Sequence, residues 1–199
     1  MSPLSPLLFS TFEVTTQAFY RASLSYAIVN LKPIAPGHVL VVPKRVVPRL
    51  TDLDDKELSC LMSSVKRVGS VVEKAYGGDA LTIACQDGKA AGQTVPHVHF
   101  HIIPRKLQGD PFGENNDEIY PELERNEAAL PGGLQAASTL PSPRKRSGEA
   151  RPVTTNGTTA HEASPMTVTN SYVDAEPDRP PRTLFEMEKE ARWLEGFFA

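Results

Sequence analysis

Cysteine, long apolar runs and net charge are all scarce in this chain of 199 residues. Two cysteines, Cys60 and Cys85, are too few for a disulfide framework of the kind that holds small secreted domains together. No apolar run is long enough to span a membrane, and the proline-broken start lacks the features of a signal peptide. A formal net charge of -3 gives no electrostatic basis for non-specific nucleic-acid binding. We therefore expect a cytoplasmic or nuclear protein with no nucleic-acid or membrane partner.

Histidine is scarce too, but three of the five histidines alternate with apolar residues in His97-Val98-His99-Phe100-His101. This alternation predicts a β-strand with one imidazole face and one apolar face. Neighbouring side chains on one face of a strand stand roughly 6.5–7 Å apart, so the rings can surround one anionic group or one metal ion. Burying three titratable rings costs desolvation energy at each, which packing alone does not explain.

Two chemistries fit this cluster, and the spacing does not separate them. Three imidazoles and a water molecule make a catalytic zinc centre. Alternatively, one histidine acts as a nucleophile while its neighbours hold its tautomer and neutralise phosphate oxygens. The segment Gly92-Gln93-Thr94, just before the histidines, offers backbone N–H groups, an amide and a hydroxyl. These groups favour phosphate over a metal.

The rest of the pattern predicts an α+β fold with an antiparallel sheet. Asp54 with Glu57 is typical of a helix start, and Gly77-Gly78 of its end. Thr183 with Glu186 begins a second, amphipathic helix that is expected to reach the C-terminus. Strands are expected at 24–30, 38–43, 80–86 and in the histidine stretch, with an edge strand or arm at 11–20.

Composition divides the chain into three parts. Residues 1–130 are expected to form the catalytic domain, in which 118–123 is a short turn. Residues 131–182 contain no Phe, Ile, Trp or Cys and are rich in Pro, Ser, Thr, Ala and Gly. So little apolar surface does not offset the entropy of ordering, which predicts a disordered insertion. Residues 183–199 are expected to pack on the domain or on a second copy of the chain.

The run from His97 to Ile103 resembles the histidine-triad signature, His-φ-His-φ-His-φ-φ with φ apolar. The chain is most similar to the fragile-histidine-triad branch, the dinucleoside triphosphate hydrolases, and in particular to its fungal-type members, over roughly residues 7–125. The resemblance implies a HIT-like fold with one long helix and a C-terminal helix, a homodimer, and hydrolysis of diadenosine triphosphate to AMP and ADP. The matching pieces are Asn30–Leu40, Gln86-Asp87-Gly88, Ala91–Thr94 and Ile103–Lys106.

The same resemblance implies a role for individual residues. His99 is the expected nucleophile, which forms a covalent nucleotidyl-histidine. His97 and His101 are expected to contact phosphate oxygens, His38 to support one of them, and Gln93 to bind the phosphate chain and position water. The expected substrate contacts are Asn30 at the ribose, Gln86 at the nucleotide, Ile28 at the base, and Gly92, Gln93, Thr94, Val95 and His101 at the phosphates. We expect no tightly bound protein metal; Mg or Mn is expected to arrive with the substrate.

Alternatives remain open at this point. Nucleoside phosphoramidases of the same superfamily are similar, but usually carry Ser in place of Thr94 and glycines in place of Pro104-Arg105. A nucleotide-sensing protein, whose substrate-bound form signals, would use the same residues. Lys89-Ala90 replaces a Pro-Glu pair that is common in the branch, which leaves the preferred polyphosphate length open.

Overall fold

The centre of the computed structural model, which describes residues 5–139 and 181–198, is a five-stranded antiparallel sheet. The strand order is β3-β4-β5-β7-β6, and a small hairpin of β1 and β2 precedes it in the chain. The predicted α+β class and antiparallel sheet are therefore confirmed. The strands are β1 (Leu8–Phe9), β2 (Phe12–Glu13), β3 (Ala18–Arg21), β4 (Ser25–Val29), β5 (Val39–Pro43), β6 (Ala80–Ala84) and β7 (Phe100–Arg105).

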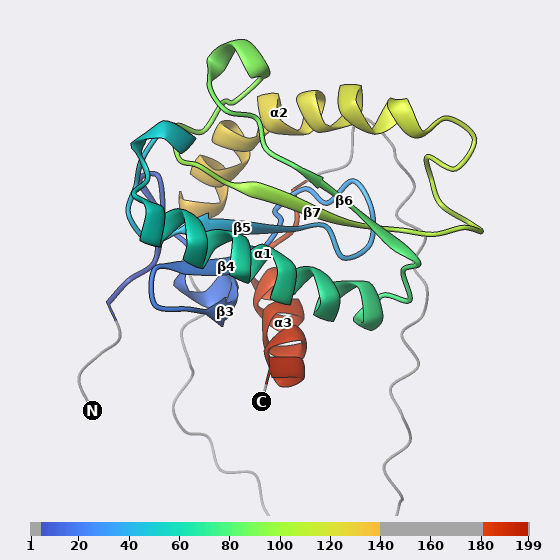
Figure 1. Cartoon of the computed structure of the whole chain (residues 1–199), viewed down its shortest axis with the longest axis horizontal. Helices are drawn as coiled ribbons and strands as arrows, with labels where there is room; N and C mark the ends of the chain where they lie inside the picture. Colours follow the sequence, from blue (N-terminus) through green and yellow to red (C-terminus); the bar gives the residue numbers. More distant parts are fainter. Residues whose placement is uncertain (1–4, 140–180, 199) are drawn as a thin grey trace, which may run out of the picture.

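Helix α1 (Asp55–Ala75) crosses the sheet and packs on β4, β5 and β7 (Figure 1). It begins as predicted, because the Asp54 carboxylate accepts the Glu57 N–H and the Glu57 carboxylate accepts the Asp54 N–H. It ends at Gly77, whose φ of 62° is costly for other residues. The buried stripe that holds the helix on the sheet consists of Leu61, Val65, Val68 and Val72.

A second long helix, α2 (Ile119–Thr139), was not expected. Both the predicted turn at 118–123 and the start of a disordered insertion at 131 are wrong. Pro131-Gly132-Gly133 favours a break, but Leu130 and Leu134 are buried in the main core, and that burial outweighs the local propensity. Figure 1 shows α2 bending part-way along, as is expected for a helix with an internal proline. Residues 140–180 of the predicted insertion lie outside the described residues, whereas its last residue, Arg182, is hydrogen-bonded to the loop after β4.

Helix α3 (Leu184–Glu195) begins with the predicted capping box of Thr183 and Glu186. It is followed by a 3-10 turn at Gly196–Phe198 rather than continuing as an α-helix. Its buried side chains, Met187, Ala191 and Leu194, join the main core next to β3.

The start of α3 is fixed to the loop after β4. Arg182 donates from its backbone to the Leu31 carbonyl at 3.0 Å and from its guanidinium to the Asn30 carbonyl. The Glu190 carboxylate accepts from Arg182 and from the Tyr76 hydroxyl. These contacts bring the end of the chain to a loop that leads directly to His38.

Cys60 and Cys85 are both free thiols. Within 5–139 and 181–198, no helix combines the length and the apolar character needed to cross a bilayer.

The packing of α2 predicts the effect of shortening Leu134, which is 4% exposed. Leu134→Ala is expected to lower the free energy of unfolding by about 2–4 kcal/mol, because it removes buried apolar atoms and leaves a cavity. Chemical denaturation measures the loss. The exposed neighbour Gln135 gives a matched control, and Gln135→Ala is expected to change stability by less than about 0.5 kcal/mol. Equal effects of the two changes would contradict the packing of α2 on the core.

Candidate active site

The histidine stretch is a strand only in its second half. β7 begins at Phe100, so of the three clustered histidines only His101 pairs in the sheet, opposite Leu40 and Ala84. Before it the chain turns, with the His97 N–H bonded to the Val95 carbonyl at 2.7 Å. Pro96 has no N–H to give to a ladder, which explains why the predicted strand starts late.

His97 faces away from the other two rings. Its Nδ1 accepts the Ser10 N–H at 3.0 Å, so its Nε2 carries the proton and donates to the Pro43 carbonyl at 3.0 Å. Burial lowers the pKa of His97 to about 4, which keeps the ring neutral. The Phe9 ring lies between His97 and His99, with centroid distances of 5.7 and 5.2 Å. With both nitrogens used, His97 anchors the β1–β2 hairpin and has no nitrogen free for a phosphate.

His99 is held in one orientation by the backbone. Its Nδ1–H donates to the His97 carbonyl at 2.7 Å, which aims Nε2 at the Glu127 Oε1 atom 3.1 Å away. Burial lowers the pKa of His99, but the hydrogen bond and charge of Glu127 outweigh burial and raise it above its ordinary value. This direction favours a protonated His99 ring paired with the Glu127 carboxylate, and Nε2 can act as a nucleophile only after that proton leaves.

A chain of hydrogen bonds sets the proton on His101. The Ile34 N–H donates to His38 Nδ1 at 3.3 Å, and His38 Nε2 lies 2.9 Å from His101 Nδ1 and 3.1 Å from the Asn30 amide nitrogen. Because Nδ1 accepts from Ile34, we assign the proton to His38 Nε2, from which it is donated to His101 Nδ1. Burial, followed by the charges of Arg182 and His99, lowers the pKa of His38 to about 3. Burial, then the His99 and His38 charges, holds the pKa of His101 well below its ordinary range. The single proton of His101 therefore lies on Nε2.

His101 Nε2 is a buried donor aimed into the site. It lies 3.5 Å from Glu127 Oε1 and makes no hydrogen bond within the described part of the chain. A buried donor without a partner costs about 1–3 kcal/mol. His99 and His101 thus converge on one anionic oxygen, with ring centroids 5.0 Å apart.

Glu127 is the residue that sequence reasoning missed. It lies on α2 and is 0% exposed, although glutamate is rarely buried. Burial raises the pKa of Glu127, but the hydrogen bond and charge of His99, together with His101 and Thr94, lower it by more. The pKa of Glu127 therefore lies below its ordinary value, and the carboxylate is charged. The available signal was its spacing: Ile119, Leu123, Leu130 and Leu134 form a helical apolar stripe, and Glu127 occupies a position of that stripe.

Pro131 explains how the Glu127 backbone is held at the site. A proline has no N–H for the carbonyl four residues earlier, so the Glu127 carbonyl lacks its usual helical donor. The Thr94 hydroxyl donates to this carbonyl at 2.6 Å. Thr94, predicted as a phosphate contact, here fastens α2 to the histidine loop.

The donors of the site also bear on a metal. His99, His101 and Glu127 offer ligand atoms within 4.8 Å of one another, and His97 is not part of this group. A metal on His101 Nε2 would require the proton to move to Nδ1, against the Nε2–H of His38, whose Nδ1 already accepts from Ile34. The hydrogen-bond chain therefore favours an anion over a metal ion. The three-histidine zinc geometry considered from the sequence is wrong, because His97 points elsewhere.

The other predicted site residues surround this centre. Gln93 has both ends engaged, since its Oε1 accepts the Gly88 N–H at 3.1 Å and its Nε2 donates to the Pro48 carbonyl at 3.0 Å. At Gly92 (φ 90°) an added Cβ would lie 2.5 Å from the Gln86 amide nitrogen, so a side chain there would displace Gln86. Asn30, 1% exposed, contacts His38 at 3.1 Å. Ile28 and Val95 are buried in the main core rather than facing an open pocket.

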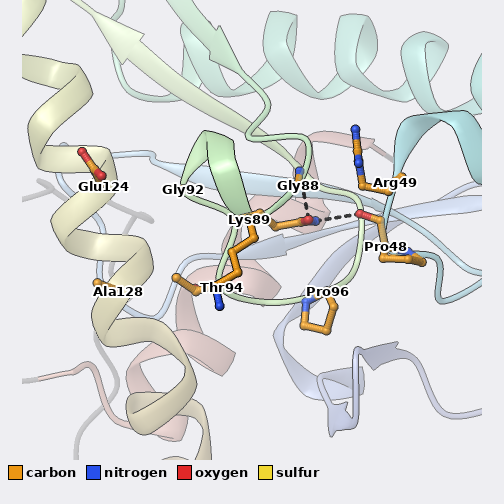
Figure 2. Close-up of a pocket in the computed structure, with 10 residues that line it drawn as sticks. Pro48, Arg49, Gly88, Lys89, Gly92, Thr94, Pro96, Glu124 and Ala128 are labelled. Atoms are coloured by element: carbon orange, nitrogen blue, oxygen red, sulfur yellow. Dashed lines mark hydrogen bonds between the residues drawn. The ribbon is translucent and has the colours of Figure 1, made fainter.

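A pocket of about 740 Å³ opens beside the histidines (Figure 2). Figure 2 shows Glu124 and Ala128 of α2 on one side of it and the loop with Gly88, Lys89 and Thr94 on the other. No histidine lines it. Its wall carries two cationic side chains, of which Arg49 is bonded to Asp87 at 3.1 Å. The lining residues are Pro48, Arg49, Gly88, Lys89, Gly92, Gln93, Thr94, Pro96, Glu124 and Ala128.

The chain that carries this site is similar to proteins of one known family. The family model described as the HIT domain matches residues 11–108. A relative from Schizosaccharomyces pombe, bis(5'-nucleosyl)-tetraphosphatase [asymmetrical], is 50% identical over 193 residues, which cover 97% of this chain and 94% of that protein. The chain therefore belongs to the HIT-domain family.

Further relatives lie in the predicted branch. Bis(5'-adenosyl)-triphosphatase of Dictyostelium discoideum is 56% identical over 110 residues, covering 55% of this chain and 72% of that protein. The crystal structure of the C. elegans NitFhit protein has a TM-score of 0.53 and 46% identity, over 64% of this chain and 31% of that one. Plasmodium falciparum diadenosine triphosphate hydrolase has a TM-score of 0.52 and 29% identity, over 67% and 89%.

The hydrogen-bond partners predict the protonation of each ring. At neutral pH, His38, His97 and His101 are expected to be neutral with the proton on Nε2, and His99 to carry a proton on both nitrogens. Long-range ¹H–¹⁵N correlation spectra of histidine-labelled protein distinguish these forms directly. A neutral His101 with its proton on Nδ1 would contradict the chain from Ile34 and reopen the metal assignment.

Proposed function

We propose that this protein hydrolyses dinucleoside polyphosphates, with diadenosine triphosphate giving AMP and ADP, through a covalent nucleotidyl-histidine. The relatives named as bis(5'-adenosyl)-triphosphatase and asymmetrical bis(5'-nucleosyl)-tetraphosphatase support this substrate class. The observation that carries the proposal is the convergence of His99 Nε2 and His101 Nε2 on one carboxylate oxygen, at 3.1 and 3.5 Å. A phosphoryl oxygen is an anion of the same kind.

In this proposal His99 carries out the first step. The His99 Nε2 proton first passes to the Glu127 carboxylate, which frees the Nε2 lone pair. The lone pair then forms a bond to the α-phosphorus while the bridging P–O bond breaks, and the leaving nucleoside diphosphate keeps the bonding electrons. The His99 Nδ1–H, held by the His97 carbonyl, stabilises the positive charge that develops on the ring. His101 donates from Nε2 to an oxygen of the reacting phosphate, supported by His38.

The second step breaks the bond between His99 and phosphorus. A water oxygen attacks the phosphorus, the N–P bond breaks, and its electron pair returns to His99 Nε2, while the water proton passes to solvent. Dividing one displacement into two in-line steps lowers the barrier in a preorganised site. In this proposal His97 orients His99 through its carbonyl, and Gln93 shapes the Gly88 loop instead of contacting the phosphate.

We propose that the second nucleotide of the substrate binds in the pocket beside the histidines. Lys89 and Arg49 on its wall suit the negative charge of a polyphosphate chain. A divalent cation, Mg or Mn, is proposed to arrive bound to these phosphates, since carboxylate and phosphate oxygens are the ligands it prefers. We also propose that the protein is located in the cytoplasm or the nucleus.

Replacement of the nucleophile tests the reaction. His99→Asn is expected to reduce turnover of diadenosine triphosphate by at least about 10⁴-fold, because no lone pair remains to attack phosphorus. Nucleotide binding, measured by calorimetry, is expected to persist. Products from diadenosine triphosphate, diadenosine tetraphosphate and adenosine phosphoramidate are identified by mass spectrometry, together with the trapped adduct on His99.

Glu188 on α3, a partly exposed residue that forms an ion pair with Arg192, supplies the control for that experiment. Glu188→Gln is expected to leave turnover unchanged. Retained turnover in His99→Asn, or an adduct on another residue, would contradict the assignment. Turnover of the phosphoramidate alone would replace the proposed substrate class.

We also propose that the chain forms a homodimer. The support is an unpaired sheet edge: β6 is the last strand of the sheet, and its Ile83 is 47% exposed. Sedimentation equilibrium at micromolar concentration is expected to give twice the chain mass. Ile83→Lys is expected to shift the protein to monomer, because a lysine on an edge strand opposes pairing. A wild-type monomer would contradict the proposal.

A further inference from the structure

The nucleophile of this site is closed off from solvent. His99 is 1% exposed and His101 is 0% exposed. The element that lies over them is α2, whose Glu127 carboxylate contacts both rings and whose Asn126 is 8% exposed. The open pocket stops at the loop with Gln93 and Thr94 and does not include either histidine. No phosphate reaches His99 while α2 keeps this position.

The Glu127 carboxylate also occupies the place that a reacting phosphate needs. Reacting atoms approach to about 3–3.5 Å before bond formation. Glu127 Oε1 lies 3.1 Å from His99 Nε2, the ring nitrogen that remains once the Nδ1–H donates to the His97 carbonyl. A carboxylate and a phosphate are both anions, so they exclude each other sterically and by charge.

We infer that Glu127 is an internal competitor of the substrate: its carboxylate holds the phosphate position in the resting enzyme, and nucleotides bind only after α2 has moved it away. This inference rests on the proposed function, since it names the ligand of the same two histidines. The anchors of the closed state are the ion pair with His99, the bond from Thr94 to the Glu127 carbonyl, and the buried Leu130. Opening breaks the first two and weakens the third.

A closed resting state has a measurable consequence. The apparent dissociation constant of every phosphate ligand equals its intrinsic value divided by the fraction of open enzyme. The factor is the same for substrate and for AMP, because both need the same vacated position. If the open state is populated at about 10% or less, removing the competitor raises apparent affinity by about 10-fold or more.

The test compares Glu127→Gln with wild-type enzyme. The glutamine has nearly the same shape but no charge, so the pair with His99 is lost. We expect kcat/KM for diadenosine triphosphate to rise about 10-fold, and the inhibition constant of AMP to fall by the same factor. Because loss of the carboxylate also lowers the pKa of His99, while His38, His97 and His101 stay neutral, the acid limb of the kcat/KM profile is expected to move to lower pH.

The matched control is a glutamate on the same helix. Glu122 pairs with Arg125 at 2.5 Å, and Glu122→Gln is expected to change neither constant. In wild-type protein, AMP is expected to increase amide hydrogen exchange along the part of α2 around Glu127, with no change in α1. This second measurement applies even if Glu127→Gln fails to fold.

Three results would overturn the inference. One is a folded Glu127→Gln enzyme with lower kcat/KM, which would make Glu127 a contributor to catalysis. Another is an unchanged inhibition constant for AMP. The third is protection of α2 from exchange when AMP binds. Failure of the proposed function is distinguishable, because it appears as an absence of AMP binding and of diadenosine triphosphate turnover in the wild-type enzyme.

Discussion

The site depends on one series of linked hydrogen bonds that begins at a backbone amide. The Ile34 N–H fixes the acceptor nitrogen of His38, His38 fixes the acceptor nitrogen of His101, and the last proton is left on the His101 nitrogen that faces Glu127. In this series, the tautomer of each imidazole is set by its hydrogen-bond partner. Because the three groups are buried, water cannot substitute for a missing partner, and the direction of the whole series follows from the loop that carries Ile34.

That loop is held by residues far away in the chain. Arg182, just before α3, binds the carbonyls of Asn30 and Leu31, and its charge also opposes protonation of His38. The Tyr76 and Glu190 contacts hold Arg182 in turn. The C-terminal helix therefore does more than complete the core: it fixes the backbone from which the orientation of His38, and so of His101, is set. A segment far from the histidines in the sequence is therefore part of the support of the site.

The sequence predicted what local rules decide. Helix starts with capping boxes at Asp54 and Thr183, and the apolar strands β4, β5 and β6, are local patterns, and the structure has them within a few residues. The long helix α2 was missed because Pro131-Gly132-Gly133 is locally unfavourable, and only contact with a distant core shows that Leu130 and Leu134 outweigh it. The strand was predicted to include His97 because the alternation of the histidines was read as one continuous ladder, whereas the ladder begins only at Phe100.

Glu127 shows that a site can contain residues that lie outside its sequence motif. The signature supplies the histidines, but a histidine triad alone leaves two buried nitrogens without an anion, at a cost that the folded chain has to meet. In the resting state Glu127 offsets this cost, because it brings a carboxylate from α2 to the two histidines. Pro131 leaves the Glu127 carbonyl without a helical donor, so that Thr94 can bind it. The same preference for an anion that makes the site suitable for phosphate thus makes it suitable for a glutamate of the chain itself. Catalysis then depends on how easily that glutamate is displaced.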